Sequence, residues 1–102
     1  MNHRLLVRRP AKADIWSATR WYELRWPELG REFLAEVDAA LDRVAEKPLQ
    51  YQVVHRDVRR AIIHRFPFAV FYRVEASRIV VFCVSHLHRD PALWKRRTEG
   101  KS

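Results

Sequence analysis

The sequence predicts an α+β domain in which one strand and a helical hairpin precede a small antiparallel sheet, with a short helix at the end. In the first half of the chain, apolar residues recur at three- and four-residue spacing on both sides of Pro27, which is typical of two packed helices. In the second half, short β-branched and aromatic runs alternate with turn residues, which is typical of a meander. The order is therefore β-α-α-β-β-β, with the helices packed on the sheet.

The first three elements follow from apolar spacing and proline positions. A short strand over residues 4–8 ends before Pro10, and a helix follows from Lys12 to about Trp26. Pro27 cannot continue that helix but can begin the next one, which Pro48 stops. Almost no loop separates the helices, so they form an antiparallel hairpin. The expected core positions are Ile15, Ala18, Tyr22, Trp26, Phe33, Val37, Ala40, Leu41 and Val44.

The second half is expected to supply the sheet. The connector over 48–57 is expected to be irregular, and three strands follow it, over 58–64, 69–76 and 79–87. The last strand is the most apolar, so we expect it to be central. Asp90 can cap a short helix that begins at Pro91, from which Leu93 and Trp94 pack back. One domain over 1–97 and a disordered tail over 98–102 are predicted.

The charge is concentrated in the second half of the chain. Residues 52–102 hold eleven Lys and Arg against four Asp and Glu, whereas residues 1–51 hold nine against eight. A basic half attracts nucleic acid or an acidic protein by the same field. Nine of the eleven cations are arginines, which suit bidentate contacts with phosphate and carboxylate, although a GC-rich genome gives the same bias.

Several kinds of site are excluded or not expected. Cys83 is the only cysteine, so there is no internal disulfide and no multi-cysteine zinc site, and its apolar surroundings predict a buried, inert thiol. With only Gly30 and Gly100 there is no glycine-rich phosphate loop. No metal site or cofactor is expected. Neither a signal peptide nor a membrane-spanning run is present, so we expect a cytoplasmic protein.

Four features of the chain together resemble a known family. They are Pro48 after the second helix, the run over 58–64, Phe71-Tyr-Arg-Val-Glu75 and Val84–Arg89. In this order they resemble the RelE/ParE superfamily of bacterial toxins from type II toxin–antitoxin modules. The ending Arg89-Asp90-Pro91 with Trp94 resembles the ParE-like branch and related plasmid stabilisation proteins. The resemblance implies a toxin that an acidic, partly disordered antitoxin neutralises in a hetero-oligomer.

The resemblance implies one of two activities. ParE-like members inhibit DNA gyrase by binding, whereas RelE-like members cut mRNA on the ribosome without a metal. Such cutting needs clustered groups that move protons and stabilise a phosphorane, which the RelE-like toxins build from strand cations, an arginine, and a tyrosine or histidine. Arg60 and Arg89 match two of the cations, and His86 or His88 could replace the acid. Ile62 and Ala69 fall where further cations are expected.

The partial match favours a gyrase inhibitor that is not an enzyme. One alternative is a ribosome-dependent mRNA endoribonuclease that uses Arg60, Arg89 and either His86 or His88. His86 and His88 would share one face of a strand, although a solvated strand end also explains them. A second alternative is a non-toxic homologue that still binds the antitoxin.

Other residues are candidates for binding the antitoxin or the target. Arg59, Arg65 and Arg73 could contact a partner or belong to an ordinary exposed strand face, and Arg73 could also pair with Glu75. Trp16 and Trp21 lie off the apolar stripe of the first helix, so they either cover the other side of the hairpin or are exposed for a partner. Packing is expected for Trp26 and Trp94.

Overall fold

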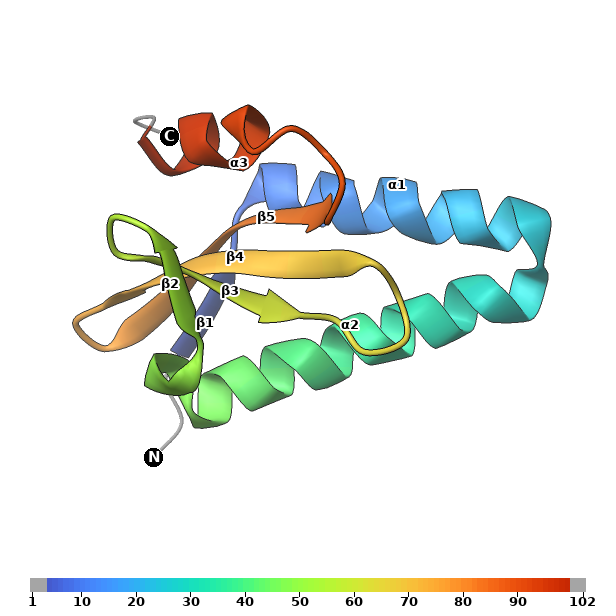
Figure 1. Cartoon of the computed structure of the whole chain (residues 1–102). Coiled ribbons are helices and arrows are strands. Elements are labelled where there is room, and N and C mark those ends of the chain that lie inside the picture. The colour runs from blue at the N-terminus through green and yellow to red at the C-terminus, as the bar shows by residue number, and fades with distance from the viewer. Residues whose placement is uncertain (1–3, 100–102) are drawn as a thin grey trace.

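The computed structural model describes residues 4–99 and confirms the predicted α+β fold (Figure 1). Its helices α1 and α2 form the expected hairpin, whose joined end projects beyond the strands. The elements in chain order are β1 (Arg4–Val7), α1 (Arg9–Arg25), α2 (Pro27–Glu46), the 3-10 turn η1 (Pro48–Gln50), β2 (Gln52–His55), β3 (Val58–Ile62), β4 (Phe68–Glu75), β5 (Arg78–His86) and α3 (Ala92–Glu99).

The sheet has five strands in the order β1-β5-β4-β3-β2 and is mixed. β1 runs parallel to β5, with Arg4 opposite Arg78 and Val7 opposite Val81, whereas the other pairs are antiparallel. A parallel pair needs a long crossover, which here includes the helical hairpin and three strands. β5 is interior, as its apolar sequence indicates, but the middle strand is β4.

The prediction of an irregular connector over 48–57 was wrong, because it contains β2. This strand pairs with β3, with Gln52 opposite Arg60, through a tight turn in which Arg56 has a φ of 54°. Turns with positive φ usually carry Asn or Gly. The Arg56-Asp57 pair lacks that sequence signal, so the hairpin was not recognised.

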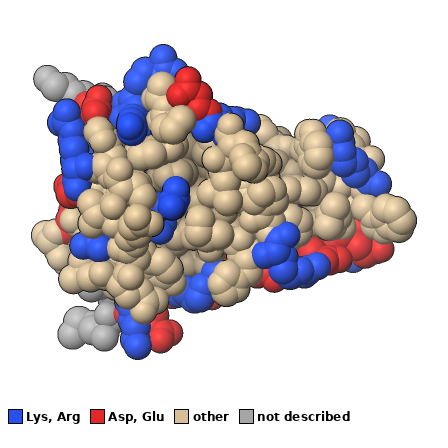
Figure 2. All heavy atoms as spheres, in the orientation of Figure 1, with Lys and Arg blue, Asp and Glu red and all other residues tan. Residues whose placement is uncertain are grey.

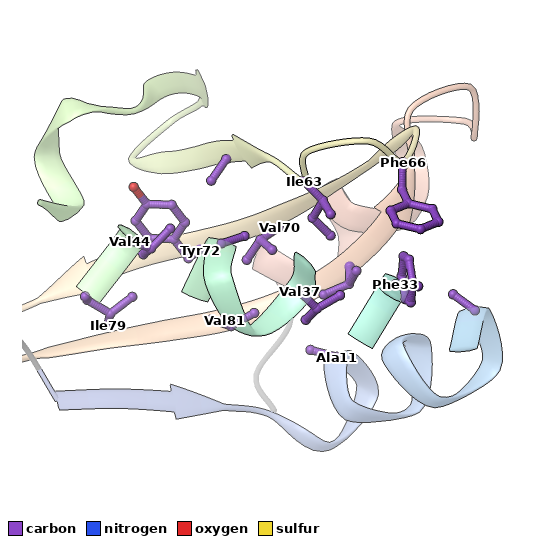
Figure 3. Close-up of a cluster of buried hydrophobic side chains, with 14 of the residues drawn as sticks. Ala11, Phe33, Val37, Val44, Ile63, Phe66, Val70, Tyr72, Ile79 and Val81 are labelled. Atoms are coloured by element: carbon purple, nitrogen blue, oxygen red, sulfur yellow. The ribbon is translucent and has the colours of Figure 1, made fainter. Parts of the chain in front are cut away.

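One face of the sheet packs against the helical hairpin. Figure 3 shows the apolar side chains that meet there, among them Phe33, Val37 and Val44 of α2. Phe33 and Phe66 lie edge to face with centroids 5.2 Å apart. The helices approach closely at Gly30, where a Cβ atom would lie 2.9 Å from the Cβ of Glu23. Glycine is therefore required there by close packing.

Helix α3 covers part of the opposite face. Trp94 is buried, as predicted, and stacks on Phe71 with ring centroids 4.5 Å apart. Thr98 and Glu99, which were assigned to the tail, belong to this helix, and residues 100–102 lie outside the described part of the chain. Trp26 was wrongly assigned to the core, since it is 65% exposed. It adopts an extended backbone between α1 and α2, so the helical stripe ends before it.

The Cys83 side chain lies buried under α3, as the sequence predicts. Burial raises the pKa of the thiol from 9.0 to about 12, and the nearby Asp14 carboxylate raises it further in the same direction. As the pH rises above 9, the thiol ionises in the unfolded chain before it does so in the folded protein. Cys83 therefore stabilises the fold below pH 9, and this stabilisation is lost as the pH rises to about 12.

We expect the native protein to resist iodoacetamide at pH 8. The raised pKa alone lowers the thiolate fraction by about a thousandfold, and burial restricts access further. Mass spectrometry should find one modified cysteine after labelling in guanidinium chloride and almost none without it. Equal labelling rates in the native and unfolded protein would contradict a buried thiol.

Candidate functional site

A pocket of about 660 Å³ lies between α1 and the end of β5. Helix α1 contributes one wall, β4 and β5 contribute apolar side chains, and the turn after β5 contributes the basic side. The lining residues are Asp14, Ser17, Ala18, Trp21, Tyr22, Phe68, Val84, His86, His88 and Arg89. Three of the four candidate catalytic residues therefore lie around one pocket.

The turn after β5 brings His86, His88 and Arg89 together. β5 ends at His86, so His88 lies in the turn and not on the predicted strand face, yet the two rings lie 5.3 Å apart. The His88 backbone N–H donates to Nδ1 of His86 at 3.1 Å, and the Arg89 N–H donates to the His86 carbonyl at 3.0 Å. Because Nδ1 accepts this bond, the ring N–H of His86 in this arrangement is on Nε2.

Within residues 4–99, Asp14 is the only acidic residue of the pocket lining, and its charge is compensated. Its two carboxylate oxygens accept from the Arg97 guanidinium at 2.5 and 3.1 Å, and one also accepts the Val84 backbone N–H at 2.9 Å. The Asp14 hydrogen bond raises the pKa of Arg97. The pocket therefore has no uncompensated negative charge among its described lining residues, while Arg89 adds a positive one.

The same ion pair completes the strand edge. β1 pairs with β5 only as far as Val81, where the Arg8 N–H donates to the Val81 carbonyl at 3.1 Å. Beyond that point the Asp14 carboxylate accepts a hydrogen bond from the Val84 backbone N–H, and the Arg97 guanidinium donates one to the Phe82 carbonyl at 3.4 Å. Side chains from α1 and α3 thus form the hydrogen bonds to the β5 edge that β1 no longer supplies.

Trp21 forms the outer part of the α1 wall and is 50% exposed. The Arg25 guanidinium carbon lies 3.3 Å from its ring centroid, which is a cation–π contact. Trp16 is 64% exposed, and Arg20 lies 5.8 Å from its ring, but Trp16 does not line the pocket. The two tryptophans are therefore open to solvent and do not cover the hairpin.

Arg60 is not brought together with the other catalytic candidates. It stands opposite Phe71, which lies under Trp94 on the α3 side of the sheet. His86 stands opposite Phe68, which packs against the core under the helical hairpin. Since paired residues in neighbouring strands point to the same face, Arg60 and His86 lie on opposite faces. The nearest hydrogen-bond partner of Arg60 is Gln52, at 3.4 Å.

The two strand positions at which the family resemblance predicts further cations lie side by side. Ile62 stands opposite Ala69, and Ala69 stands opposite Ser85. Ile62 is partly exposed, whereas Ala69 and Ser85 are buried. This row of neutral side chains lies on the same side of the sheet as Arg60. Figure 2 shows Lys and Arg gathered around α3, whereas the middle of the same view carries few charges.

The three arginines proposed for partner binding, two on strands and Arg65 in the turn between β3 and β4, all have partners within the chain. Arg59 donates to the Leu49 and Tyr51 carbonyls, at 3.1 and 2.7 Å. Arg65 forms an ion pair with Glu32 of α2. Arg73 donates to Asp57 at 2.8 Å and to the Thr98 carbonyl at 3.2 Å. The suggested pairing of Arg73 with Glu75 was wrong, because Glu75 pairs with Arg78 at 3.1 Å.

The comparisons with known proteins give the family. The family model for the ParE toxin of the type II toxin–antitoxin system parDE matches residues 5–91. The chain belongs to the ParE toxin family. No curated protein matches it. Among residues 4–99 of this ParE-family chain, no group of three or more His, Cys, Asp or Glu could hold a metal ion, and no helix is long and apolar enough to cross a membrane.

Two solved structures are similar to this chain in fold. The chromosomal ParDE toxin–antitoxin system from P. aeruginosa has a TM-score of 0.74 at 19% identity, covering 82% of this chain and 95% of that one. The toxin–antitoxin complex RelBE2 from Mycobacterium tuberculosis has a TM-score of 0.59 at 18% identity, covering 84% of this chain and 99% of that one. At these identities the likeness concerns the fold.

Sequence reasoning missed four residues that line the pocket of this chain: Asp14, Ser17, Tyr22 and Phe68. A signal was present for the first two, because Asp14, Ser17 and Trp21 recur at three- and four-residue spacing on α1 and so share one side of it. Nothing in the sequence shows which strand end this side of the helix meets.

We expect Asp14→Ala to destabilise the protein by about 2 kcal/mol or more, because the change removes the carboxylate partner of Arg97 and leaves the Val84 N–H without its acceptor. Asp14→Asn should be milder, since an amide oxygen can still accept one bond. Urea unfolding measures both changes, and hydrogen exchange should become faster at the Val84 amide. Asp38→Asn, on the exposed side of α2, is the control. If Asp14→Ala were as stable as the control, the ion pair of Asp14 with Arg97 would contribute nothing to the free energy of unfolding.

Proposed function

We propose that this toxin inhibits DNA gyrase by binding it and does not cut RNA. Membership of the ParE family establishes the toxin class, and the target is the step we add. The observation that carries the proposal is the separation of the candidate catalytic groups. Arg60 lies on one face of the sheet, and His86 with Arg89 lies around a pocket on the other.

Metal-free RNA cleavage requires several groups within hydrogen-bond reach of one phosphate. The intervening sheet keeps Arg60 away from the histidines, so these groups do not meet at one phosphate. On the face that carries Arg60, the neighbouring positions are Ile62 and Ala69, which neither transfer protons nor stabilise negative charge. This arrangement favours a protein that acts by binding.

We also propose that an acidic antitoxin neutralises the toxin in a hetero-oligomer in the cytoplasm. The two structural relatives are described as toxin–antitoxin systems or complexes. The formal net charge of +8 favours association with an acidic partner and makes the association sensitive to salt. Exposed Trp16 and Trp21, each beside an arginine, are suited to a protein interface.

A supercoiling assay with purified gyrase tests the target. We expect inhibition that rises with toxin concentration and disappears when the cognate antitoxin is added. Ribosomes translating a defined mRNA should show no toxin-dependent cleavage in primer extension. The Arg60→Ala variant should inhibit gyrase as the parent does, because Arg60 is a candidate only for RNA cleavage, which inhibition by binding does not require.

The outcomes separate the three candidate functions. Cleavage that is lost in the His86→Ala, His88→Ala, Arg89→Ala triple variant would establish an endoribonuclease that uses the clustered groups. Normal growth on induction without antitoxin, together with unchanged supercoiling, would indicate a non-toxic homologue. Either result would reject gyrase inhibition as the function.

A further inference from the structure

We propose that the pocket between α1 and the turn after β5 binds an acidic peptide segment of a protein partner, which inserts one aromatic or branched apolar side chain. The inference deepens the proposed function and rests on its claim that this domain acts by binding proteins. It specifies where on the domain the partner binds and which kinds of side chain the partner contributes. The pocket volume of about 660 Å³ falls within the usual range for ligand pockets.

The inner part of the pocket is suited to an apolar side chain. Ala18 and Val84 are buried, Tyr22 is 9% exposed, and Phe68 is partly buried. Burial raises the pKa of the Tyr22 phenol, so this side chain stays neutral well above physiological pH. An inserted aromatic ring could pack edge to face against Tyr22, as Phe66 does from the core side at 4.9 Å.

The outer part of the pocket is suited to carboxylates. Arg89 is exposed in the turn, and the His86 ring presents an Nε2–H donor because its Nδ1 is already occupied. Ser17 adds an exposed hydroxyl from α1. The Asp14 carboxylate in the lining is paired with Arg97, so it does not repel an acidic partner as a bare carboxylate would.

Trp21 and Arg25 provide the edge on which such a segment would lie. The indole is held by the guanidinium 3.3 Å above it, which limits its movement before binding. Tryptophan and arginine are enriched among residues that contribute most to protein interfaces. An indole that is half exposed beside a pocket therefore has the position of an interface anchor.

The charges favour a peptide over nucleic acid. Nucleic-acid affinity comes from many phosphate contacts made by lysines and arginines along a groove. Among the described residues that line the pocket, Arg89 is the only arginine and there is no lysine. A single arginine with two histidines suits one or two carboxylates on a short segment.

The test is a selection of random peptides displayed on phage against the purified full chain. We expect enriched sequences to combine one aromatic or leucine residue with neighbouring Asp or Glu. Synthetic copies should shift the indole signal of Trp21 and the amide signals of residues 86–89 in NMR spectra. Replacing the apolar residue or the acids of the peptide by alanine should weaken binding by about tenfold or more.

Matched variants locate the binding. Trp21→Ala and Arg89→Glu should each weaken peptide binding by about tenfold, and Ser17→Trp should block the pocket. Trp26→Ala is the control, because Trp26 is also an exposed tryptophan near the hairpin but does not line the pocket. Circular dichroism and thermal unfolding confirm that each variant folds. Arg89→Glu keeps the test valid if the Trp21 variant does not fold.

Three results would overturn the inference: no enriched sequence, an enriched basic sequence, or binding that Arg89→Glu and Ser17→Trp leave unchanged. Competition of the selected peptide by a short oligothymidine would instead indicate nucleic acid as the ligand. The selection uses neither gyrase nor antitoxin. If the selection fails but the toxin inhibits gyrase, only this inference is rejected. If the selection succeeds but gyrase is not inhibited, the proposed target is rejected and this inference is retained.

Discussion

The Asp14 carboxylate is the contact on which the pocket depends. β1 ends at Val7, whereas β5 continues to His86, so the outer part of β5 needs another partner on that side. Asp14 from α1 accepts the Val84 N–H and binds Arg97 from α3 through both oxygens. A largely buried carboxylate is stable only when it is paired and hydrogen-bonded. One acidic side chain thus fixes the first helix, the strand edge and the last helix relative to one another.

This arrangement gives the two faces of the sheet different roles. The hairpin side forms the main core and, at its margin, the pocket with His86 and Arg89. The other side holds Trp94 stacked on Phe71, and beside them the neutral pair Ile62 and Ala69. Charged groups that would have to act together on one phosphate are therefore distributed over both faces. This distribution is the basis on which we propose that the toxin acts by binding another protein.

Most of the secondary structure could be predicted because its causes are local. Helical spacing, Pro27 and Pro48 determine the hairpin, and β-branched runs determine β3, β4 and β5. β2 was missed because its turn carries Arg56 at positive φ in place of Asn or Gly. The parallel pairing of β1 was missed because its partner is more than seventy residues away. Periodicity within one segment carries no information on such a pair.

The sequence by itself determined the α+β order, the basic second half, and the closeness of His86, His88 and Arg89, which one turn holds together. Only the tertiary structure decided that Arg60 lies on the opposite face of the sheet from the histidines, and that Asp14 lines the same pocket as the turn after β5. It also decided that Arg59, Arg65 and Arg73 have partners, which lie between 8 and 33 residues away. The physical reason is that ion pairs and hydrogen bonds between side chains depend on distance in space, which the fold alone creates.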